Sequence, residues 1–527
     1  MEEKVTTVET EKALAGFNAD DELLAQLGYK AELKRNFSVI EVFGIAFSIM
    51  SLLPSIAASM VYSLPGGAIG MTWGWLVPSI FILSVGIAMA EFGSALPTSG
   101  GLYWWTFRFS PKKIQRPLCF LAGYSNTLGL IGGTCSITYG LANFILSIPA
   151  ICDPSFVPNA YQSYGVFVAC MISIAVAGSI ATPIISRLQG LCIVLNLIVI
   201  VITVIALPIG TEKLNSAKFV FTDTTSYSEW PTGWAFFMSW LSAVWTIGAF
   251  DSCVHMAEEA SNAARAVPLG IVLSIAMCGL LGFTVMAIIV ACIPDFEAVL
   301  NNPYGQPMAQ IYLNSLGKNW TIAMMVLLCI IQWFMGLSIV VAASRQTWAF
   351  SRDGALPFSR IVRVVNYKLG VPVRAVWFVC LCAILVGLLS MIDPAAANAL
   401  FSLAVASNGL AWWLPIVCRA IWFKRDDFTP GPFYLGHTLS RINCFVASTY
   451  LVFSICVLSM FPNAGPNVDK STMNYTCVLN GTVWLGCLVY YAIDAHKWFE
   501  GPKTTLDEDI IVAVEAVHAA EHPETTK

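Results

Sequence analysis

The sequence predicts an all-α protein that crosses a membrane about twelve times. Of its 527 residues, 57% are hydrophobic and only 11% are charged, and the mean hydropathy is +0.71. Soluble domains carry about 25% charged residues, so this chain lacks the polar surface that a water-facing exterior needs. Apolar runs long enough for a membrane helix recur along it, and Lys and Arg concentrate in alternate loops. Together these observations predict a polytopic helical membrane protein.

The predicted spans follow one another with short polar connections. Each run approaches or exceeds the roughly 20 residues that a bilayer core requires. The pair on either side of Asp393-Pro394 is the least distinct, because only that turn separates the two runs. In order, the runs lie near 39–63, 70–95, 117–149, 164–184, 188–210, 234–259, 268–293, 320–348, 374–392, 396–421, 442–461 and 476–497.

The distribution of Lys and Arg predicts the topology. One set of loops holds most of these residues, from Lys30, Lys34 and Arg35 through Arg108 to Arg441. The opposite loops hold only Lys213, Lys218, Lys318 and Lys470. By the positive-inside rule both termini are cytosolic. On this topology the sequons at Asn319 and Asn474 face outward, where glycosylation is open to them.

The tails outside the spans are polar. Residues 1–37 contain no cleavable signal peptide. Within them, 21–34 can form a short amphipathic helix on the inner membrane face or a helical lead-in to the first span, and neither is favoured. Residues 499–527 form an acidic tail. We therefore expect a membrane domain over 38–498 between two cytosolic tails.

Composition and spacing exclude several classes of function. Sixteen cysteines are scattered through apolar runs without CxxC pairs, which favours small core thiols over disulfides or metal ligands. The five histidines lack metal-ligand spacing, and the net charge of −4 comes without a basic patch for nucleic acid. No nucleophile–base cluster and no ring of carboxylates is apparent, which argues against an enzyme and an ion channel. No cofactor or metal is expected.

The sixth span holds the clearest polar anomaly. Gly248, Asp251 and His255 interrupt its apolar pattern, and Glu258 and Glu259 follow. An aspartate at a helix centre costs roughly 2.5–3.5 kcal/mol to insert, so such a residue usually faces a cavity on a solute path. The alternative is that Asp251 pairs with a neighbouring helix and only holds the bundle together.

The first span carries a second anomaly, because residues 44–55 mix Gly44, Ser48, Ser51 and Pro54 into an apolar run. Close packing or a kink would explain them. The sharper hypothesis pairs spans 1 and 6 as interrupted helices of an inverted repeat. The repeats would be 38–210 and 234–421, with two extra helices in 442–498.

Such breaks have a chemical meaning. A break exposes backbone N–H groups on one side, which suit a carboxylate, and C=O groups on the other, which suit an ammonium. An amino acid has both groups. Further candidate wall residues are polar or aromatic side chains within spans, although packing explains each one singly: Tyr124, Asn126, Asn196, Gln332, Trp333, Asn408, Trp412 and Trp413.

Several motifs carry a family resemblance. "AEFGSALPTSGGLYWW" (90–105) and "AFDSCVHMAEE" (249–259) resemble the span 2–3 loop and the sixth-helix signature of the amino acid–polyamine–organocation (APC) permeases. "ASRQTWAFSRDGALPFS" (343–359) and "PGPFYLG" (430–436) resemble its fungal amino acid/choline branch. The chain is most similar there to the fungal GABA permeases, through "VWTIGAFDSCVH" (244–255) among others.

The resemblance implies a LeuT-like five-plus-five inverted repeat with two added helices, and proton-coupled uptake of GABA or a related amine. Carried over by position, the break in helix 1 that holds the substrate carboxylate is Ser48, Ile49, Met50 and Ser51. The break in helix 6, which faces the amine, is Trp245, Thr246, Ile247, Gly248 and Ala249, with Phe250 next to it. Cytosolic gate contacts would involve Glu258 or Glu259 and Arg265.

The proton-coupling residue cannot be carried over, because several prokaryotic relatives have a lysine where this chain has Asn196. Asp251, Glu91 and His255 are the candidates that remain. Choline, polyamine or general amino-acid transport stays open as the alternative, with Phe47, Trp245, Phe250 and Trp412 as an aromatic box for choline. A transporter-like nutrient receptor is a further alternative. The plasma membrane is expected, and the vacuolar membrane is the alternative.

Overall fold

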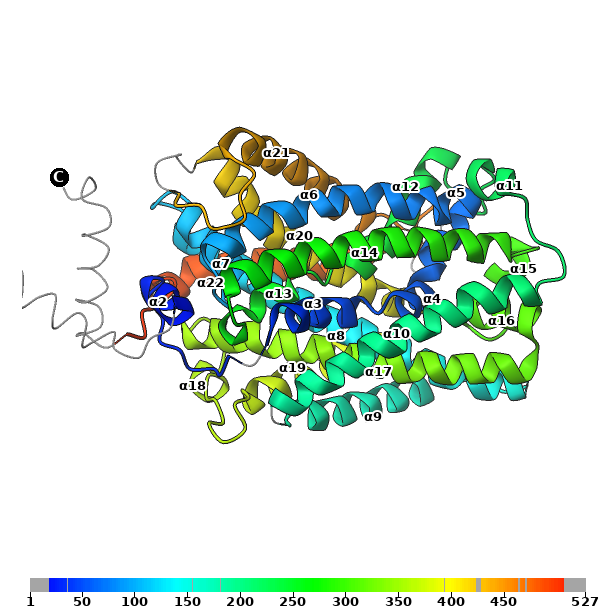
Figure 1. Ribbon diagram of the computed structural model, residues 1–527, viewed down its shortest axis with the longest axis horizontal. Helices are drawn as coiled ribbons and strands as arrows, with labels where there is room; N and C mark the ends of the chain where they lie inside the picture. Colours follow the sequence, from blue (N-terminus) through cyan, green and yellow to red (C-terminus); the bar gives the residue numbers. More distant parts are fainter. Residues whose placement is uncertain are drawn as a thin grey trace, which may run out of the picture.

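The computed structural model confirms the predicted fold class, an all-α bundle (Figure 1). It describes residues 19–35, 37–153, 155–180, 182–392, 394–422, 428–462, 465–469 and 472–506. Over these residues, 12 helical stretches are long and apolar enough to cross a membrane, in agreement with the predicted number. Most of the acidic tail predicted over 499–527 lies outside the described residues.

The spans are built from the following helices. In chain order they are α3 (Val39–Met50) with α4 (Leu52–Ser63), α6 (Trp73–Ala95), α8 (Gln115–Cys152), α9 (Ala160–Gly178), α10 (Thr182–Gly210), α12 (Thr232–Ile247) with α13 (Ser252–His255), α14 (Ala263–Ala291), α17 (Lys318–Arg352), α19 (Val373–Gly387), α20 (Pro394–Ile421), α21 (His437–Phe453) and α22 (Thr476–Ile493).

Shorter helices extend or connect these spans. They are α2 (Ala19–Gln26), η1 (Leu64–Gly66), α5 (Gly67–Met71), α7 (Gly101–Phe109), α11 (Ala217–Thr222), η2 (Ala257–Glu259), α15 (Phe296–Leu300), α16 (Pro307–Leu316), α18 (Ser359–Val362), η3 (Leu388–Met391), η5 (Ser454–Leu458) and η6 (Ala495–Lys497). In Figure 1, α2, α7 and α18 lie at the end of the bundle where the described chain begins and finishes, which we call the termini end. The helices α5, α11, α15 and α16 lie at the opposite end.

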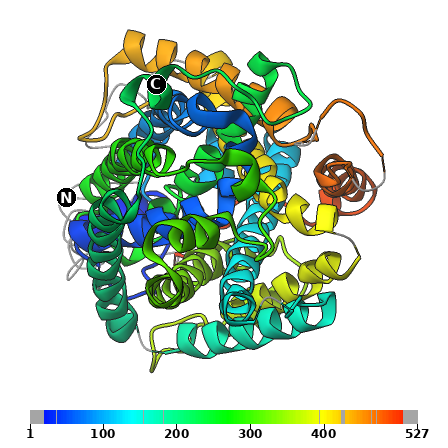
Figure 2. The same ribbon diagram turned by 90° about the vertical axis from the view of Figure 1, so that its right-hand side faces the viewer.

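The interrupted helices occupy the middle of the bundle. Helix α4 packs on α12, α3 packs on α14 and α17, and α8 packs on α17 and α20. Helices α9, α10 and α22 lie at the periphery with many exposed apolar side chains, as lipid contact requires, and α22 stands apart at one edge in Figure 2. The buried centre therefore consists of α3, α4, α8, α12, α13, α17 and α20.

Local sequence signals place the start of the first span. Ser38 and Glu41 form a capping box, in which each side chain accepts a hydrogen bond from the other residue's backbone N–H. Phe37 forms an isolated parallel bridge with Ala260, between its N–H and Glu259 O and between Ser261 N–H and its own carbonyl. This contact ties the start of the first span, just before α3, to the segment that follows η2 after the sixth span.

The two chain ends meet at the termini end. Among the described residues 19–35, Ala19–Gln26 is helical and residues 27–35 are irregular and rest on the protein, which differs from the predicted helix over 21–34. The carbonyl of Gly28 accepts hydrogen bonds from Thr505 N and Thr504 Oγ1, each at 2.9 Å. The backbone N–H of Lys30 donates to Thr505 Oγ1, also at 2.9 Å. The N-terminal and C-terminal segments therefore cover this end together.

Candidate functional site

The first span is interrupted at Ser51, as the sequence predicts. Helix α3 ends at Met50 and α4 begins at Leu52, and Ser51 between them is left-handed, with φ 30° and ψ 69°. A left-handed residue other than glycine is uncommon and strained, so the helix changes direction here. Ser55 Oγ donates to the carbonyl of Met50 at 2.6 Å, and Ser51 Oγ donates to that of Ser48. Serine hydroxyls thus bind two of the carbonyls that the break releases.

The start of α4 has free donors. The first N–H groups of any helix lack an intrahelical acceptor, and here they belong to Leu52 and Leu53. Pro54 has no N–H, and Ser55 N already donates to Ser51 O at 3.0 Å. Asn196 of α10 donates to Ser51 Oγ at 3.2 Å and supports the break from behind.

The sixth span is interrupted between Ile247 and Ser252. Helix α12 ends at Ile247, so the last carbonyls of this helix lack intrahelical donors. Gly248 is needed where the chain leaves the helix, because a Cβ there would lie 2.7 Å from Val244 O and 3.3 Å from the ring of Trp412. Ser252 begins the short α13, and its hydroxyl donates to Ala249 O at 2.7 Å.

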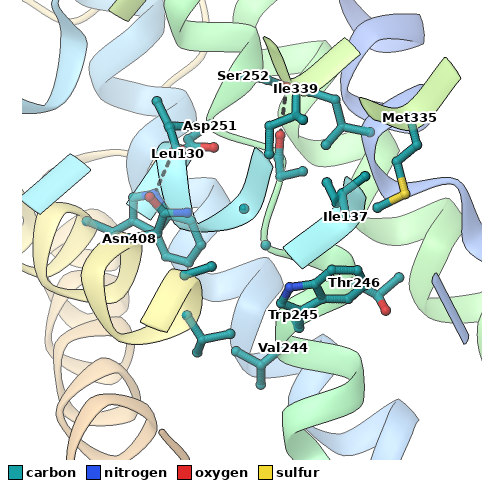
Figure 3. A pocket seen from close by; sticks show the side chains of 17 residues that line it. Leu130, Ile137, Val244, Trp245, Thr246, Asp251, Ser252, Met335, Ile339 and Asn408 are labelled. Atoms are coloured by element: carbon teal, nitrogen blue, oxygen red, sulfur yellow. Dashed lines mark hydrogen bonds between the residues drawn. The ribbon is translucent and has the colours of Figure 1, made fainter. Parts of the chain in front are cut away.

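A buried cavity of about 40 Å³ lies against both breaks. Its wall is mainly apolar, with one carboxylate, that of Asp251. Figure 3 shows Asp251 and Asn408 at one side of this cavity and Trp245 and Thr246 at another. The lining residues are Ile49, Leu130, Gly133, Ile137, Val244, Trp245, Thr246, Gly248, Ala249, Asp251, Ser252, Met335, Ile339, Ala404, Val405, Asn408 and Trp412.

Asp251 is held by nitrogen donors from two other helices. Trp412 Nε1 of α20 donates to Asp251 Oδ2 at 3.0 Å, and Asn126 Nδ2 of α8 approaches the same oxygen at 3.5 Å. The ring of Trp412 also lies 4.7 Å from that of Phe250, centroid to centroid. Asn126 Nδ2 is 3.5 Å from Asn408 Oδ1. The carboxylate is 1% exposed, so these donors replace the hydrogen bonds that water would give it.

Two buried ion pairs close the termini end below the cavity. Arg352 donates to both carboxylate oxygens of Glu258, at 2.9 and 3.1 Å, and Arg345 Nε donates to Glu259 Oε1 at 2.7 Å. We call these two contacts the closing pairs. The family resemblance implied a contact for Arg265 instead, but Arg265 is exposed at the start of α14.

A loop after α6 reinforces the first closing pair. Thr98 Oγ1 and Ser99 N donate to Glu258 Oε1 at 3.2 and 3.1 Å. With the fork of Arg352, every oxygen of this buried carboxylate has a charged donor, as a buried ion pair needs to be stable.

Both chain ends converge on Asp353, next to the closing pairs. Its carboxylate accepts hydrogen bonds from Tyr103 Oη at 2.7 Å, Tyr29 Oη at 3.2 Å and Lys503 N at 3.2 Å. The guanidinium of Arg352 lies 4.0 Å above the ring of Tyr29. Burial raises the pKa of Asp353 to about 6, although Arg352 and the three donors oppose that rise.

Other predicted site residues lie elsewhere. Tyr124 Oη donates to Ala355 O at 2.9 Å, and Gln332 Nε2 donates to Ile137 O at 3.0 Å. Neither is among the described residues that line the cavity. Glu91 accepts from Leu435 N at 2.9 Å and from Ser440, so it anchors the segment before α21 to α6.

Sequence reasoning missed Arg345 and Arg352. Both stand in "ASRQTWAFSRDG" near a predicted span end, where a long basic side chain usually reaches toward the interface. In the structure, Arg345 is fully buried. The signal that could have found them is their spacing of seven residues, which puts both on one face of α17, opposite the adjacent Glu258 and Glu259.

A cavity between two interrupted helices, at the centre of twelve apolar spans, is the arrangement of a membrane permease. Residues 37–483 match the model of the amino acid permease family, and the chain belongs to that family. It is a multi-pass integral membrane protein that transports amino acids or amines.

Several relatives cover almost the whole chain. It is 46% identical over 497 residues to the GABA-specific permease of Saccharomyces cerevisiae, across 93% of this chain and 87% of that protein. Identity to an uncharacterized amino-acid permease of Schizosaccharomyces pombe is 35%, covering 93% and 90%. Identity to a putative polyamine transporter of Candida albicans is 30%, covering 94% and 91%.

A solved structure shares the fold. The manganese transporter of Eremococcus coleocola matches with a TM-score of 0.54, covering 90% of this chain and 95% of that one at 13% identity. At that identity the likeness concerns the fold alone.

Proposed function

We propose that the protein imports GABA, or a closely related ω-amino acid, by alternating access driven by protons. The observation that carries this proposal is the small apolar cavity set against two helix breaks. Free N–H groups at the start of α4 suit a carboxylate, and free carbonyls at the end of α12 suit an ammonium. A zwitterion with an apolar chain between its charges matches both poles and the wall between them.

The roles of individual residues follow from this arrangement. The segment Ser48–Ser51, with the N–H groups of Leu52 and Leu53 beyond it, would bind the carboxylate. Residues 245–250 would bind the ammonium through backbone carbonyls, while Asn126 and Trp412 hold Asp251 beside them and Asn408 holds Asn126. Glu258 and Glu259 would act as the gate through the closing pairs.

The similarity to the GABA-specific permease of Saccharomyces cerevisiae supports the choice of substrate. The mainly apolar wall of the cavity supports it as well, because such a wall suits the apolar chain of GABA better than the repeated ammonium groups of a polyamine. The two buried closing pairs fit a state that is closed on the side of the termini.

Orientation and location belong to the same proposal. The Lys- and Arg-rich loops lie on the side of the termini, so both termini would be cytosolic and the closing pairs would form the cytosolic gate. We assign the protein to the plasma membrane, with the vacuolar membrane as the alternative. The membrane domain 38–498 would divide into two repeats, 38–210 and 234–421, and two added helices in 442–498.

Choline is the second candidate substrate, because Trp245 and Trp412 line the cavity. The proposed aromatic box is incomplete, since Phe47 stacks on Phe43 with centroids 5.5 Å apart and is not among the described lining residues. Phe250 is likewise engaged with Trp412.

Uptake of radiolabelled GABA in a permease-deficient yeast tests the proposal. Expression should raise uptake, a protonophore should abolish the increase, and unlabelled GABA should compete better than choline, putrescine or α-amino acids. Robust choline uptake without GABA uptake would replace the first candidate by the second.

A further inference from the structure

Asp251 and His255 lie close together in the sixth span, and no hydrogen atom is available for a hydrogen bond between them. His255 is fully buried, and its Nδ1 lies 3.2 Å from the carbonyl oxygen of Ser99. A carbonyl oxygen only accepts, so Nδ1 carries the hydrogen of this bond. In a neutral ring Nε2 then has a bare lone pair.

A carboxylate oxygen lies near that nitrogen. Nε2 of His255 lies 3.8 Å from Asp251 Oδ2. Among the described atoms, Nε2 is buried without a hydrogen-bond partner. Two acceptors that face each other in a dry interior repel, and one proton between them turns the contact into a hydrogen bond.

We propose that Asp251 and His255 form the proton-binding site that couples transport to the proton gradient. This inference rests on the proposed function, since it names the place where the driving proton binds. One proton enters from the cavity side, where Asp251 lines the wall, and is held between Oδ2 and Nε2. It leaves toward the termini end when the closing pairs separate.

The surroundings favour a proton over a metal ion. The other groups that reach Asp251 Oδ2 are the N–H of Trp412 and the amide N–H of Asn126, which are donors. A sodium or divalent ion needs several oxygen ligands and would be repelled by these hydrogens. A proton needs only one lone pair, and His255 supplies it.

Neighbouring charges are already compensated. Helices α3, α14, α17 and η2 pack on α13, and the described side chains of α8 and α20 that donate to Asp251 are the neutral Asn126 and Trp412. The charged groups of these elements include Arg345 with Glu259, Arg352 with Glu258, Glu41 at the capping box and the exposed Arg265. On α13 itself, the thiol of Cys253 donates to Val42 O. The closing pairs cancel, so the occupancy of the proton site sets the charge beside the cavity.

The site is also connected to the gate. Ser99, whose carbonyl accepts from His255, donates its own N–H to Glu258 at 3.1 Å. When the proton binds, the 3.8 Å gap shortens and draws His255 toward Asp251. When it leaves, repulsion pushes the ring toward Ser99 and the first closing pair. The same two residues therefore contact the cavity on one side and the gate on the other.

Purified protein in proteoliposomes tests the site with two assays on each variant. Counterflow of radiolabelled GABA at equal pH measures binding and exchange, and an acid-outside gradient measures coupled accumulation. One pH unit supports about tenfold accumulation per proton. We expect H255Q to keep counterflow within about threefold of wild type, and both H255Q and D251N to lose the gradient-driven accumulation. A pyranine signal for GABA-driven proton entry should disappear with it.

Two further variants sharpen the result. H255N keeps an N–H near Ser99 O but has no atom in the place of Nε2, so it should also be uncoupled. The matched control is H496Q, because His496 Nδ1 also lies 3.2 Å from a carbonyl, that of Tyr491, on an exposed part of the chain. H496Q should remain coupled.

The outcomes separate the two proposals. If wild type accumulates GABA with the gradient and D251N and H255Q do so equally, the site is wrong and the transport proposal stands. A monodisperse H255Q that loses counterflow together with accumulation would also refute the coupling role and indicate packing or substrate binding. A wild type that exchanges GABA without responding to the gradient would refute proton coupling itself, and the site with it.

Discussion

Arg345 and Glu259 form an ion pair that is buried completely, with 2.7 Å between Nε and Oε1 and both side chains at most 1% exposed. Removing one partner of such a pair leaves an uncompensated charge and costs about 3–5 kcal/mol. We expect E259Q and R345M each to lower the thermal stability of the purified protein strongly, measured by fluorescence-detected size exclusion after heating. The double variant E259Q/R345M should recover most of the loss.

The exposed pair Lys497–Asp494, at 3.6 Å, is the control for that comparison. An exposed pair contributes about 0–1 kcal/mol, so D494N should leave the melting temperature nearly unchanged. Equal losses in the double and single variants would show that the two residues do not act as a pair.

Gly248 should tolerate no side chain. A Cβ there would meet Val244 O at 2.7 Å, and a backbone atom cannot move aside as a side chain can. Overpacking of this kind costs about 1–3 kcal/mol, so G248A should reduce GABA uptake about tenfold or more at equal surface expression. Gly233, near the start of the same helix, has no atom within 4 Å of an added Cβ, and G233A should transport like wild type. Normal uptake by G248A would contradict the role of the break.

Ser51 should respond to the shape of its replacement. Its φ of 30° is strained for any side chain and most strained for a β-branched one. S51G relieves the backbone and loses only the hydroxyl, whereas S51V adds strain of about 1–3 kcal/mol. Uptake per molecule at the surface should fall in the order wild type, S51G, S51V. Equal activity of S51G and S51V would mean that the left-handed conformation does not matter for transport.

Acidity on the side of the termini should stabilise the closed state through Asp353. Its pKa of about 6 when buried exceeds its usual value of 3.8, so the closed arrangement binds the proton more tightly than an open, solvated one. That contribution is fully present below pH 3.8 and is lost as the pH rises through about 6. Lowering the internal pH from about 7.5 to 5.5 should therefore slow transport, roughly fourfold if opening limits the rate.

Counterflow in proteoliposomes buffered to the same pH on both sides checks this expectation, because no proton gradient then drives transport. D353N, which resembles the protonated side chain, should remove the effect of internal pH, and D494N should keep it. A wild-type rate that is independent of internal pH would contradict the prediction.

The sequence predicts the spans well because a bilayer imposes the length of each apolar run. It also locates the breaks, since Gly248 and Asp251 in one span and Ser51 in the other disturb an otherwise apolar helix. Which of the candidate residues contact one another does not follow from the sequence. Asn126, Asp251 and Trp412 are candidates separately, but only tertiary packing puts them on one carboxylate oxygen.

The closing pairs show the same limit. Glu258 and Arg352 are separated by 94 residues, and Glu259 and Arg345 by 86, so no local pattern links them. A basic residue near the end of a span has a plain explanation in snorkelling. That explanation fails here because α17 extends to Arg352, beyond the predicted end of the span at 348, and faces η2.

The contacts between the N-terminal and C-terminal segments link both ends of the described chain to the closing pairs. Residues 503–505 hold Gly28 and, through Lys503 N, also Asp353. Separation of the two segments would therefore also weaken a hydrogen bond to Asp353, from Lys503 N on one side or from Tyr29 Oη on the other. The separation of the two ends is thus a readout of the gate, and a donor and an acceptor fluorophore on the two tails would follow each transport cycle from outside the membrane domain.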